Sequence, residues 1–331
     1  MVIPRRAFTL TLLTGLTSPR MLHAQSAKGV ARIGFLAPGG PGIDSWGASV
    51  ETFRQALREL GWVDGQNLVI DVRYAEGRYD RLPDLAAELV ALKPDVIFAG
   101  AVNSAQAAKR ATTTIPIVME TLGDAVSTGL VTNLARPGGN ITGVSGFAPE
   151  LSAKRLELLR EILPSAARVA LLANLSNPGS PGIIRATESA ARQMRVQIRV
   201  VDVRRPTELD NAFDTMARQR SEALVVVADP MIFGERRRII ELAARHRLPA
   251  VYEVRLFADD GGLLSYGPGS VERFQRAAVY VDRILKGAKP GDLPIEQPSK
   301  FELVVNLKTA KALGVKFLPA FLLRADHVIH P

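Results

Sequence analysis

Apolar runs and amphipathic segments alternate along most of this chain, and that alternation limits the folds it can adopt. An apolar run begins at Val96 and stops at small and polar residues, an Ala-rich segment follows at 105–111, and a second apolar run begins at Ile115. This pattern indicates strand, loop, helix and strand, repeated about every thirty residues, which is the size of a βαβ unit. Helices that alternate with buried strands are typical of parallel sheets with right-handed crossovers.

The same periodicity predicts the remaining elements. Besides the run from Val96, strands are expected at 30–36, 67–74, 115–119, 168–173, 197–203, 223–228, 250–254 and 301–306, the last of these being the final strand. Helices are expected at 46–60, 82–92, 105–111, 151–163, 182–194, 207–218, 234–246 and 271–285. The fold class is therefore α/β, with two successive halves of similar rhythm that form two Rossmann-like lobes.

The length of 331 residues predicts two domains, because single cores stop growing at about 250–300 residues. Residues 135–146 are rich in Gly and Pro, and we interpret them as the first crossing between the domains. The predicted boundaries are 30–143 plus 267–290 for the N-terminal lobe and 144–266 plus 291–331 for the C-terminal lobe. Several crossings of this kind form a multi-strand hinge, with a cleft between the strand ends of the two lobes.

The first 24 residues have the layout of a bacterial export signal. Arg5 and Arg6 precede an uncharged run from Ala7 to Pro19, and small residues suited to cleavage lie before Gln25. The arginine pair with Phe8 also permits the twin-arginine export route, so both the Sec and the Tat route stay open. The run is shorter than the ~20 residues that span a membrane. We expect a soluble, exported mature protein.

Composition excludes several classes of function. The chain has no cysteine, which rules out disulfides, a thiol nucleophile and cysteine-based metal sites. The net charge is +9, or nearer +6 without the signal, and the basic residues are scattered rather than gathered on one arm, which argues against a nucleic-acid partner.

No catalytic, cofactor or metal motif assembles either. The loop Gly39–Gly42 fits neither a dinucleotide fingerprint nor a P-loop, and the segment Gly143–Gly146 is one residue short of a nucleophile elbow. His327 and His330 lie three apart beside Asp326, but a frayed C-terminus is a simpler interpretation than a metal site.

A series of motifs covering about residues 30–329 resembles the ABC-transporter substrate-binding proteins of the tryptophan/tyrosine-permease type, a branch of the type I periplasmic binding proteins. The similar segments are Gly129–Val131, Leu134–Gly143, Gly262–Gly267, Ala277–Gly287, Leu293–Pro298 and Phe301–Ala310. The resemblance implies a monomeric periplasmic receptor of an ABC importer, which closes on a small ligand and docks on a permease in the inner membrane. The implied ligand is an aromatic or branched amino acid or a related carboxylate. In the family pattern Glu often replaces His327, and Glu120 is also less usual.

The resemblance also implies roles for polar residues. The ligand carboxylate is expected at Asn103, Ser104, Glu120 and Thr121 of the first lobe, with a contribution from Ser45. An acidic residue of the second lobe is expected to bind the ammonium, Asp229 first and Glu253 next. The alternatives stay open: Asn103 and Ser104 are equally suited to cap a helix, and Asp229 before Pro230 to cap a helix or form a turn.

Further candidates follow the ends of predicted strands. Trp46, Tyr74, Tyr252 and Tyr266 are placed to stack on a flat ligand, although each suits core or hinge packing as well. Ser176 and Asn177 lie in the loop after the first strand of the second lobe.

Two other functions compete with the importer receptor. The same fold serves as a sensory module for a membrane signalling protein, and an exported enzyme is a further alternative, because fold alone does not fix function.

Overall fold

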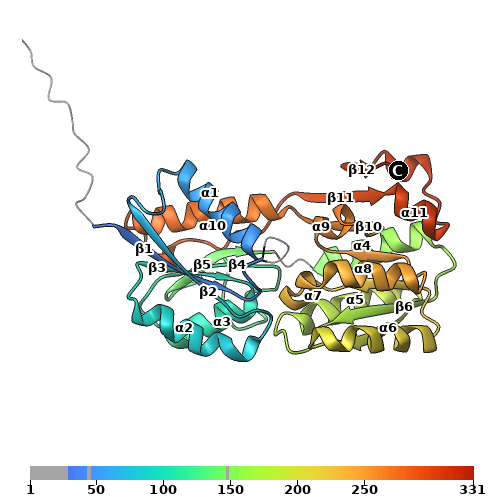
Figure 1. Ribbon diagram of the computed structural model, residues 1–331, viewed down its shortest axis with the longest axis horizontal. Coiled ribbons are helices and arrows are strands. Elements are labelled where there is room, and N and C mark those ends of the chain that lie inside the picture. The colour runs from blue at the N-terminus through green and yellow to red at the C-terminus, as the bar shows by residue number, and fades with distance from the viewer. Residues whose placement is uncertain (1–28, 43–45, 147–148) are drawn as a thin grey trace, which may run out of the picture.

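The computed structural model describes residues 29–42, 46–146 and 149–331, and shows two α/β lobes side by side (Figure 1). The first lobe is built on a parallel sheet with strand order β2-β1-β3-β4-β5. Its strands are β1 (Ala31–Ala37), β2 (Leu68–Tyr74), β3 (Val96–Gly100), β4 (Ile117–Thr121) and β5 (Ile141–Ser145); its helices are α1 (Gly47–Glu59), α2 (Leu82–Ala91), α3 (Val102–Ala111) and α10 (Ser270–Leu285), with the 3-10 turn η1 (Tyr79–Arg81) before α2.

An aromatic cluster holds the first lobe together. The ring of Phe98 on β3 lies 4.3 Å from Phe53 of α1 and 4.5 Å from Phe35 of β1, centroid to centroid. Phe274 of α10 joins the cluster at 6.0 Å from Phe98. Helix α10 therefore packs in the first lobe, although it follows the strands of the second lobe in the sequence.

The second lobe contains a sheet with the order β12-β11-β10-β9-β8-β6-β7. Its strands are β6 (Arg168–Ala173), β7 (Gln197–Asp202), β8 (Ala223–Val226), β9 (Ala250–Tyr252), β10 (Leu264–Pro268), β11 (Phe301–Asn306) and β12 (His327–Ile329). Its helices are α4 (Pro149–Ile162), α5 (Ser180–Met194), α6 (Leu209–Arg218), α7 (Pro230–Gly234), α8 (Arg236–Arg245), α9 (Arg255–Asp259), α11 (Leu307–Leu313) and α12 (Pro319–Leu322), with the short turn η2 (Pro206–Glu208) before α6. The short turn η3 (Pro290–Asp292) follows α10 and packs against β5 of the first lobe.

The structure corrects two predicted segments. The Gly-rich stretch 135–146 was expected to be only a crossing, but it contains β5, which pairs with β4 along its whole length. Gly143 within β5 has φ +135°, and a Cβ there would lie 2.1 Å from the Met119 carbonyl oxygen, so glycine is required inside this strand. At the C-terminus, residues 327–329 are not frayed, because β12 pairs in parallel with β11.

The second sheet also departs from the purely parallel expectation. Strands β10 and β11 pair antiparallel, because α10 and the residues after it pass through the first lobe between these two strands. The chain thus leaves the first lobe after β5, returns to it between β10 and α10, and leaves it again before β11 (Figure 1). The expected export signal lies outside the described residues. In the described part of the chain, no helix has both the length and the apolar character needed to cross a membrane.

Candidate ligand-binding cleft

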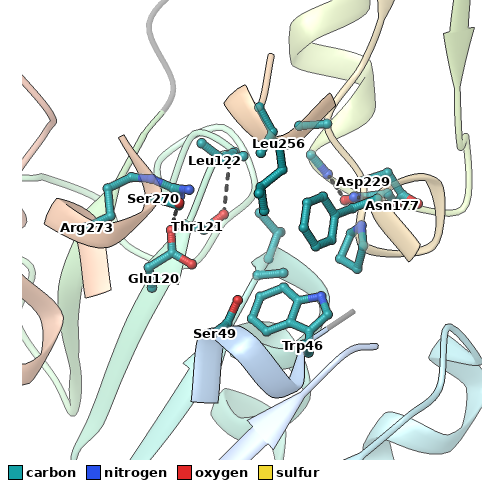
Figure 2. A pocket seen from close by; sticks show the side chains of 18 of the residues that line it. Trp46, Ser49, Glu120, Thr121, Leu122, Asn177, Asp229, Leu256, Ser270 and Arg273 are labelled. Atoms are coloured by element: carbon teal, nitrogen blue, oxygen red, sulfur yellow. Dashed lines mark hydrogen bonds and ion pairs between the residues drawn. The ribbon is translucent and has the colours of Figure 1, made fainter. Parts of the chain in front are cut away.

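A cavity of about 110 Å³ lies between the two lobes, where the carboxyl ends of their strands face each other. The first lobe lines it with Trp46, Ser49, Ala101, Val102, Glu120, Thr121, Leu122, Gly123, Ser270, Arg273 and Phe274, and the second lobe with Asn177, Gly179, Ile183, Ala228, Asp229, Pro230, Phe233, Val254, Leu256 and Phe257. Most of these side chains are apolar, with few polar groups among them (Figure 2). This is the usual composition of a small-molecule site, and the strand ends of parallel sheets are its usual place.

The lobes touch each other directly beside the cavity. The hydroxyl of Tyr79, on η1 of the first lobe, donates to Asp229 Oδ2 at 2.8 Å and accepts from the Met231 backbone N–H at 3.1 Å. Gly123 and Gly179 also meet across the gap, since a Cβ on Gly123 would lie 3.4 Å from the Gly179 Cα. The lobes are therefore in contact around the cavity rather than held apart.

Burial and the neighbouring carboxylate keep Tyr79 protonated. Both effects raise the pKa of Tyr79 well above its usual range, because an ionised phenol would be poorly solvated and repelled by Asp229. The phenol is therefore a hydrogen-bond donor at every pH at which the protein is folded and Asp229 is charged.

Asp229 already has its hydrogen-bond donors from the protein. It caps α7, because Oδ1 accepts from the backbone N–H groups of Met231 and Ile232 at 2.9 and 3.0 Å. Its Oδ2 accepts from Tyr79 and from the Asn177 side-chain amide at 2.9 Å. A carboxylate has about four lone-pair positions, so these donors occupy the acceptor positions of the Asp229 carboxylate. The predicted ammonium contact at Asp229 is therefore disfavoured: the residue lines the cavity, but its acceptors are committed to the cap and to the contact between the lobes.

The opposite wall of the cavity contains a buried ion pair. Glu120 at the end of β4 is 3% exposed and Arg273 in the first turn of α10 is 6% exposed, and their side chains are in direct contact (Figure 2). Burial raises the pKa of Glu120, and the Arg273 guanidinium counteracts that rise by stabilising the carboxylate. Sequence reasoning missed Arg273, because its segment shows only helical periodicity and an arginine near the start of a helix is ordinarily solvated.

Helix α3 begins at the cavity wall without a side-chain cap. Its N-cap residue is Ala101, with φ +101° and ψ +163°, a conformation that is costly for any residue but glycine. Asn103 and Ser104 lie inside the first turn, so neither is the helix cap that the sequence permits. Both are buried and lie outside the cavity lining. In the described part of the chain, the backbone N–H groups of Val102 and Asn103 have no hydrogen-bond partner. Free N–H groups at a helix N-terminus favour an anion.

Two buried donors on residues that line the cavity are also unused. Among the described residues, the indole Nε1 of Trp46 and the guanidinium Nε of Arg273 have no hydrogen-bond partner, although both residues are more than nine-tenths buried. Both side chains line the cavity (Figure 2). Buried donors are nearly always paired, so an acceptor from a ligand is the natural partner for them.

The other predicted contacts divide into two groups. Trp46, Glu120, Thr121, Asn177 and Asp229 line the cavity. Those that do not are Tyr74, Ser176, Tyr252, Glu253 and Tyr266, together with the buried Asn103 and Ser104. Ser45 lies outside the described residues.

Packing explains why several of these residues are elsewhere. Tyr252 stacks on Phe257 in the second core, with ring centroids 4.5 Å apart. Glu253 forms a buried ion pair with Arg155 at 3.0 Å, so its carboxylate already has a cationic partner away from the cavity lining. Tyr74 packs at the edge of the first core. A strand end in the sequence therefore locates the neighbourhood of the site but not the direction of the side chain.

Comparison with known proteins agrees with this geometry. A family model described as ABC transporter substrate binding protein matches residues 42–329. The chain belongs to this family. A tyrosine-binding protein of Clostridioides difficile (strain R20291) is 28% identical over 269 residues, which cover 81% of this chain and 77% of that protein. Family and relatives are binding proteins and not enzymes, and the fold is that of the type I periplasmic binding proteins.

Two solved structures distinguish the arrangement of the lobes. An ABC domain from Streptococcus pneumonia in complex with L-Trp is 25% identical, covers 90% of this chain and 99% of its own, and superimposes with a TM-score of 0.84. The ligand-free, open structure of a substrate-binding protein with adhesive properties from Clostridium difficile is also 25% identical, covers 91% of this chain and 100% of its own, but reaches only 0.64. This substrate-binding protein is therefore closer in overall shape to the ligand-bound relative, in agreement with its direct contacts between the lobes.

Proposed function

We propose that this protein is the periplasmic receptor of an ABC importer, which closes its two lobes on a small carboxylate and delivers it to a permease in the inner membrane. The observation that carries the proposal is the cavity between the lobes, lined from both sides and bordered by donors without partners. A ligand held by both lobes stabilises the closed state, which a permease then distinguishes from the open one.

The ligand is proposed to be an amino acid, aromatic or branched, or an aromatic acid. The apolar walls from Trp46, Phe233 and Phe257 suit a hydrophobic side chain. A cavity of about 150 Å³ accommodates benzene, so the cavity of about 110 Å³ suits a branched chain as it stands, and a ligand with a ring requires the walls to move apart slightly. Two solved relatives support this class: one is a complex with L-Trp and the other, a binding protein at lower identity, a complex with 3,4-dihydroxy benzoic acid.

The carboxylate end is proposed to lie against the first lobe. The uncapped start of α3 offers backbone N–H groups at Val102 and Asn103 beside the Thr121–Gly123 loop. The positive end of the helix dipole adds to their attraction for an anion. Thr121, Asn177 and Trp46 are retained as proposed contacts, and Ser45 as an untested one.

Export is proposed from the first 24 residues, by either the Sec or the Tat route, and the protein is proposed to act as a monomer. A sensory role for a membrane signalling protein is the alternative. In that case the same closed state would report ligand occupancy to the signalling protein. Genes for a permease and an ATPase next to this gene would favour the importer receptor over the sensory role.

A thermal-shift screen of amino acids and aromatic acids on residues 25–331 tests the proposal. A true ligand raises the melting temperature with concentration, because it binds only the folded state. Leu256 lines the cavity, whereas Leu323 is 88% exposed and does not line it. We expect Leu256→Trp to fill the cavity and abolish the shift, and Leu323→Trp to leave it unchanged. No shift with any member of the panel, or equal shifts in both variants, would refute a ligand in the cleft.

A further inference from the structure

The cavity has charged carboxylates on both of its walls, and they differ in how they are used. On the wall of the second lobe, Asp229 has donors on all its lone-pair positions, all supplied by the protein. On the wall of the first lobe, Glu120 has a single partner among the described residues, Arg273. Only Glu120 therefore has acceptor capacity left for a ligand.

Arg273 is likewise only partly used. A guanidinium has five N–H donors, and here one nitrogen, Nη1, contacts Glu120 while the buried Nε has no partner among the described residues. The first turn of α10 brings this side chain to the cavity beside Ser270 (Figure 2). One residue of the pair thus offers an acceptor and the other a donor on the same wall.

The pair also lies next to the uncapped start of α3. The backbone N–H of Ala101 donates to the Glu120 carbonyl oxygen at 2.7 Å, so the end of β4 and the start of α3 are adjacent. The end of β4 and the start of α3 therefore form one part of the cavity wall. An α-amino acid has its ammonium and its carboxylate on one carbon, and so matches an acceptor and a set of donors side by side.

Net charge decides between an amino acid and a simple acid. Glu120 and Arg273 neutralise each other, and an amino acid adds an ammonium and a carboxylate that balance in the same way. An acid without the amine adds an uncompensated negative charge beside Glu120, and like charges in a buried site disfavour binding strongly.

We infer that Glu120 binds the ammonium of an α-amino acid ligand while Arg273 Nε and the start of α3 bind its carboxylate, so that Glu120 makes the protein prefer amino acids over the corresponding acids. The inference rests on the proposed function, because it needs a ligand in the cleft. It replaces Asp229 as the ammonium partner.

Paired ligands that differ only in the amine test the inference. We propose isothermal titration of the wild type and of Glu120→Gln with L-phenylalanine and 3-phenylpropanoate, and with L-leucine and 4-methylpentanoate. Of the two amino acids, the one that the wild type binds more tightly is expected to bind at least tenfold more tightly than the corresponding acid without the amine. In Glu120→Gln the amino acid weakens by tenfold or more and the acid does not, so the preference disappears.

Asp229→Asn is the matched control, since it also neutralises one buried carboxylate of the same cavity. We expect it to retain the preference, whatever its effect on overall affinity. If Glu120→Gln fails to give a cooperative melt, Glu120→Gln combined with Arg273→Gln removes the pair as a unit, and the same loss of preference is expected.

The outcomes separate this inference from the function on which it rests. A wild type that binds the acids as tightly as the amino acids overturns the inference alone. Loss of the preference in Asp229→Asn with its retention in Glu120→Gln does the same, and returns the ammonium to Asp229. Binding of none of the ligands, in this titration or in the wider screen, overturns the proposed function together with the inference.

Discussion

Replacing Tyr79 with Phe removes a single oxygen atom from the contact between the lobes. In the closed structure that oxygen donates to Asp229 at 2.8 Å and accepts from the Met231 N–H at 3.1 Å. The ring itself packs against the cores of both lobes. The substitution therefore keeps the shape of the contact and removes its hydrogen bonds.

The expected cost follows from these two bonds. A hydrogen bond to a charged group contributes about 1.5–3 kcal/mol and a neutral one about 0.5–1.5 kcal/mol. Asp229 and the Met231 N–H keep their bond to each other, so we take the lower part of the combined range, about 2 kcal/mol. Because a ligand in the cleft requires closure, the apparent dissociation constant should rise by roughly 30-fold.

Titration calorimetry with at least two ligands measures this effect, and small-angle scattering of the ligand-free protein reports whether the lobes open. The factor should be the same for every ligand, since Tyr79 acts on closure and does not line the cavity. Tyr74→Phe is the control, because among the described residues the Tyr74 hydroxyl has no hydrogen bond to lose. A change of less than twofold, or factors that differ between ligands, would refute the reasoning.

Three further predictions test other parts of the structure. Arg155→Met leaves the buried Glu253 carboxylate without its cationic partner and should lower the free energy of unfolding in urea by about 3–5 kcal/mol. Arg324→Met breaks the exposed pair with Glu161 and should lower it by less than about 1 kcal/mol. Equal losses in the two variants would contradict this expectation. Ala101→Gly should raise the unfolding free energy by about 1 kcal/mol in the same assay, because it relieves the φ of +101°, and a loss of stability would argue against strain there. Burial raises the pKa of Asp229 above its ordinary 3.8, so its contribution to stability is present below that pH and is lost as the pH rises through the folded-state pKa. The unfolding free energy of the wild type relative to Asp229→Asn should therefore fall as the pH rises above about 4, and a rising difference would contradict the raised pKa.

The sequence located the neighbourhood of the site better than its contacts. The polar residues after the run from Val96 were correctly expected near the start of a helix, because the ends of parallel strands share one edge of a sheet. Yet Asn103 and Ser104 are buried without lining the cavity, and Ala101 and Val102 line it instead. One residue of shift along a helix changes the direction of a side chain by about 100°, and periodicity does not fix boundaries to that accuracy.

The opposite error occurred at Arg273. Its segment, 271–285, was expected as a helix, and the structure confirms α10 at Ser270–Leu285. That this helix returns to the first lobe and places an arginine against Glu120 depends on contacts between residues far apart in the chain. No local pattern contains such information, since an arginine near a helix start is ordinarily a solvated side chain.

Local periodicity by itself determined the α/β class, the presence of two successive α/β halves and the positions of most elements. It does so because the spacing of apolar residues differs between a helix and a strand and marks the side that is buried. Only the tertiary structure decided which carboxylate is free for a ligand. Asp229 and Glu120 both follow or end a buried strand, and they differ solely in the donors that distant segments bring to them: Tyr79, Asn177 and the α7 backbone to Asp229, and Arg273 alone to Glu120 among the described residues. The role of a buried charge depends on its partners, and the fold alone assembles those partners.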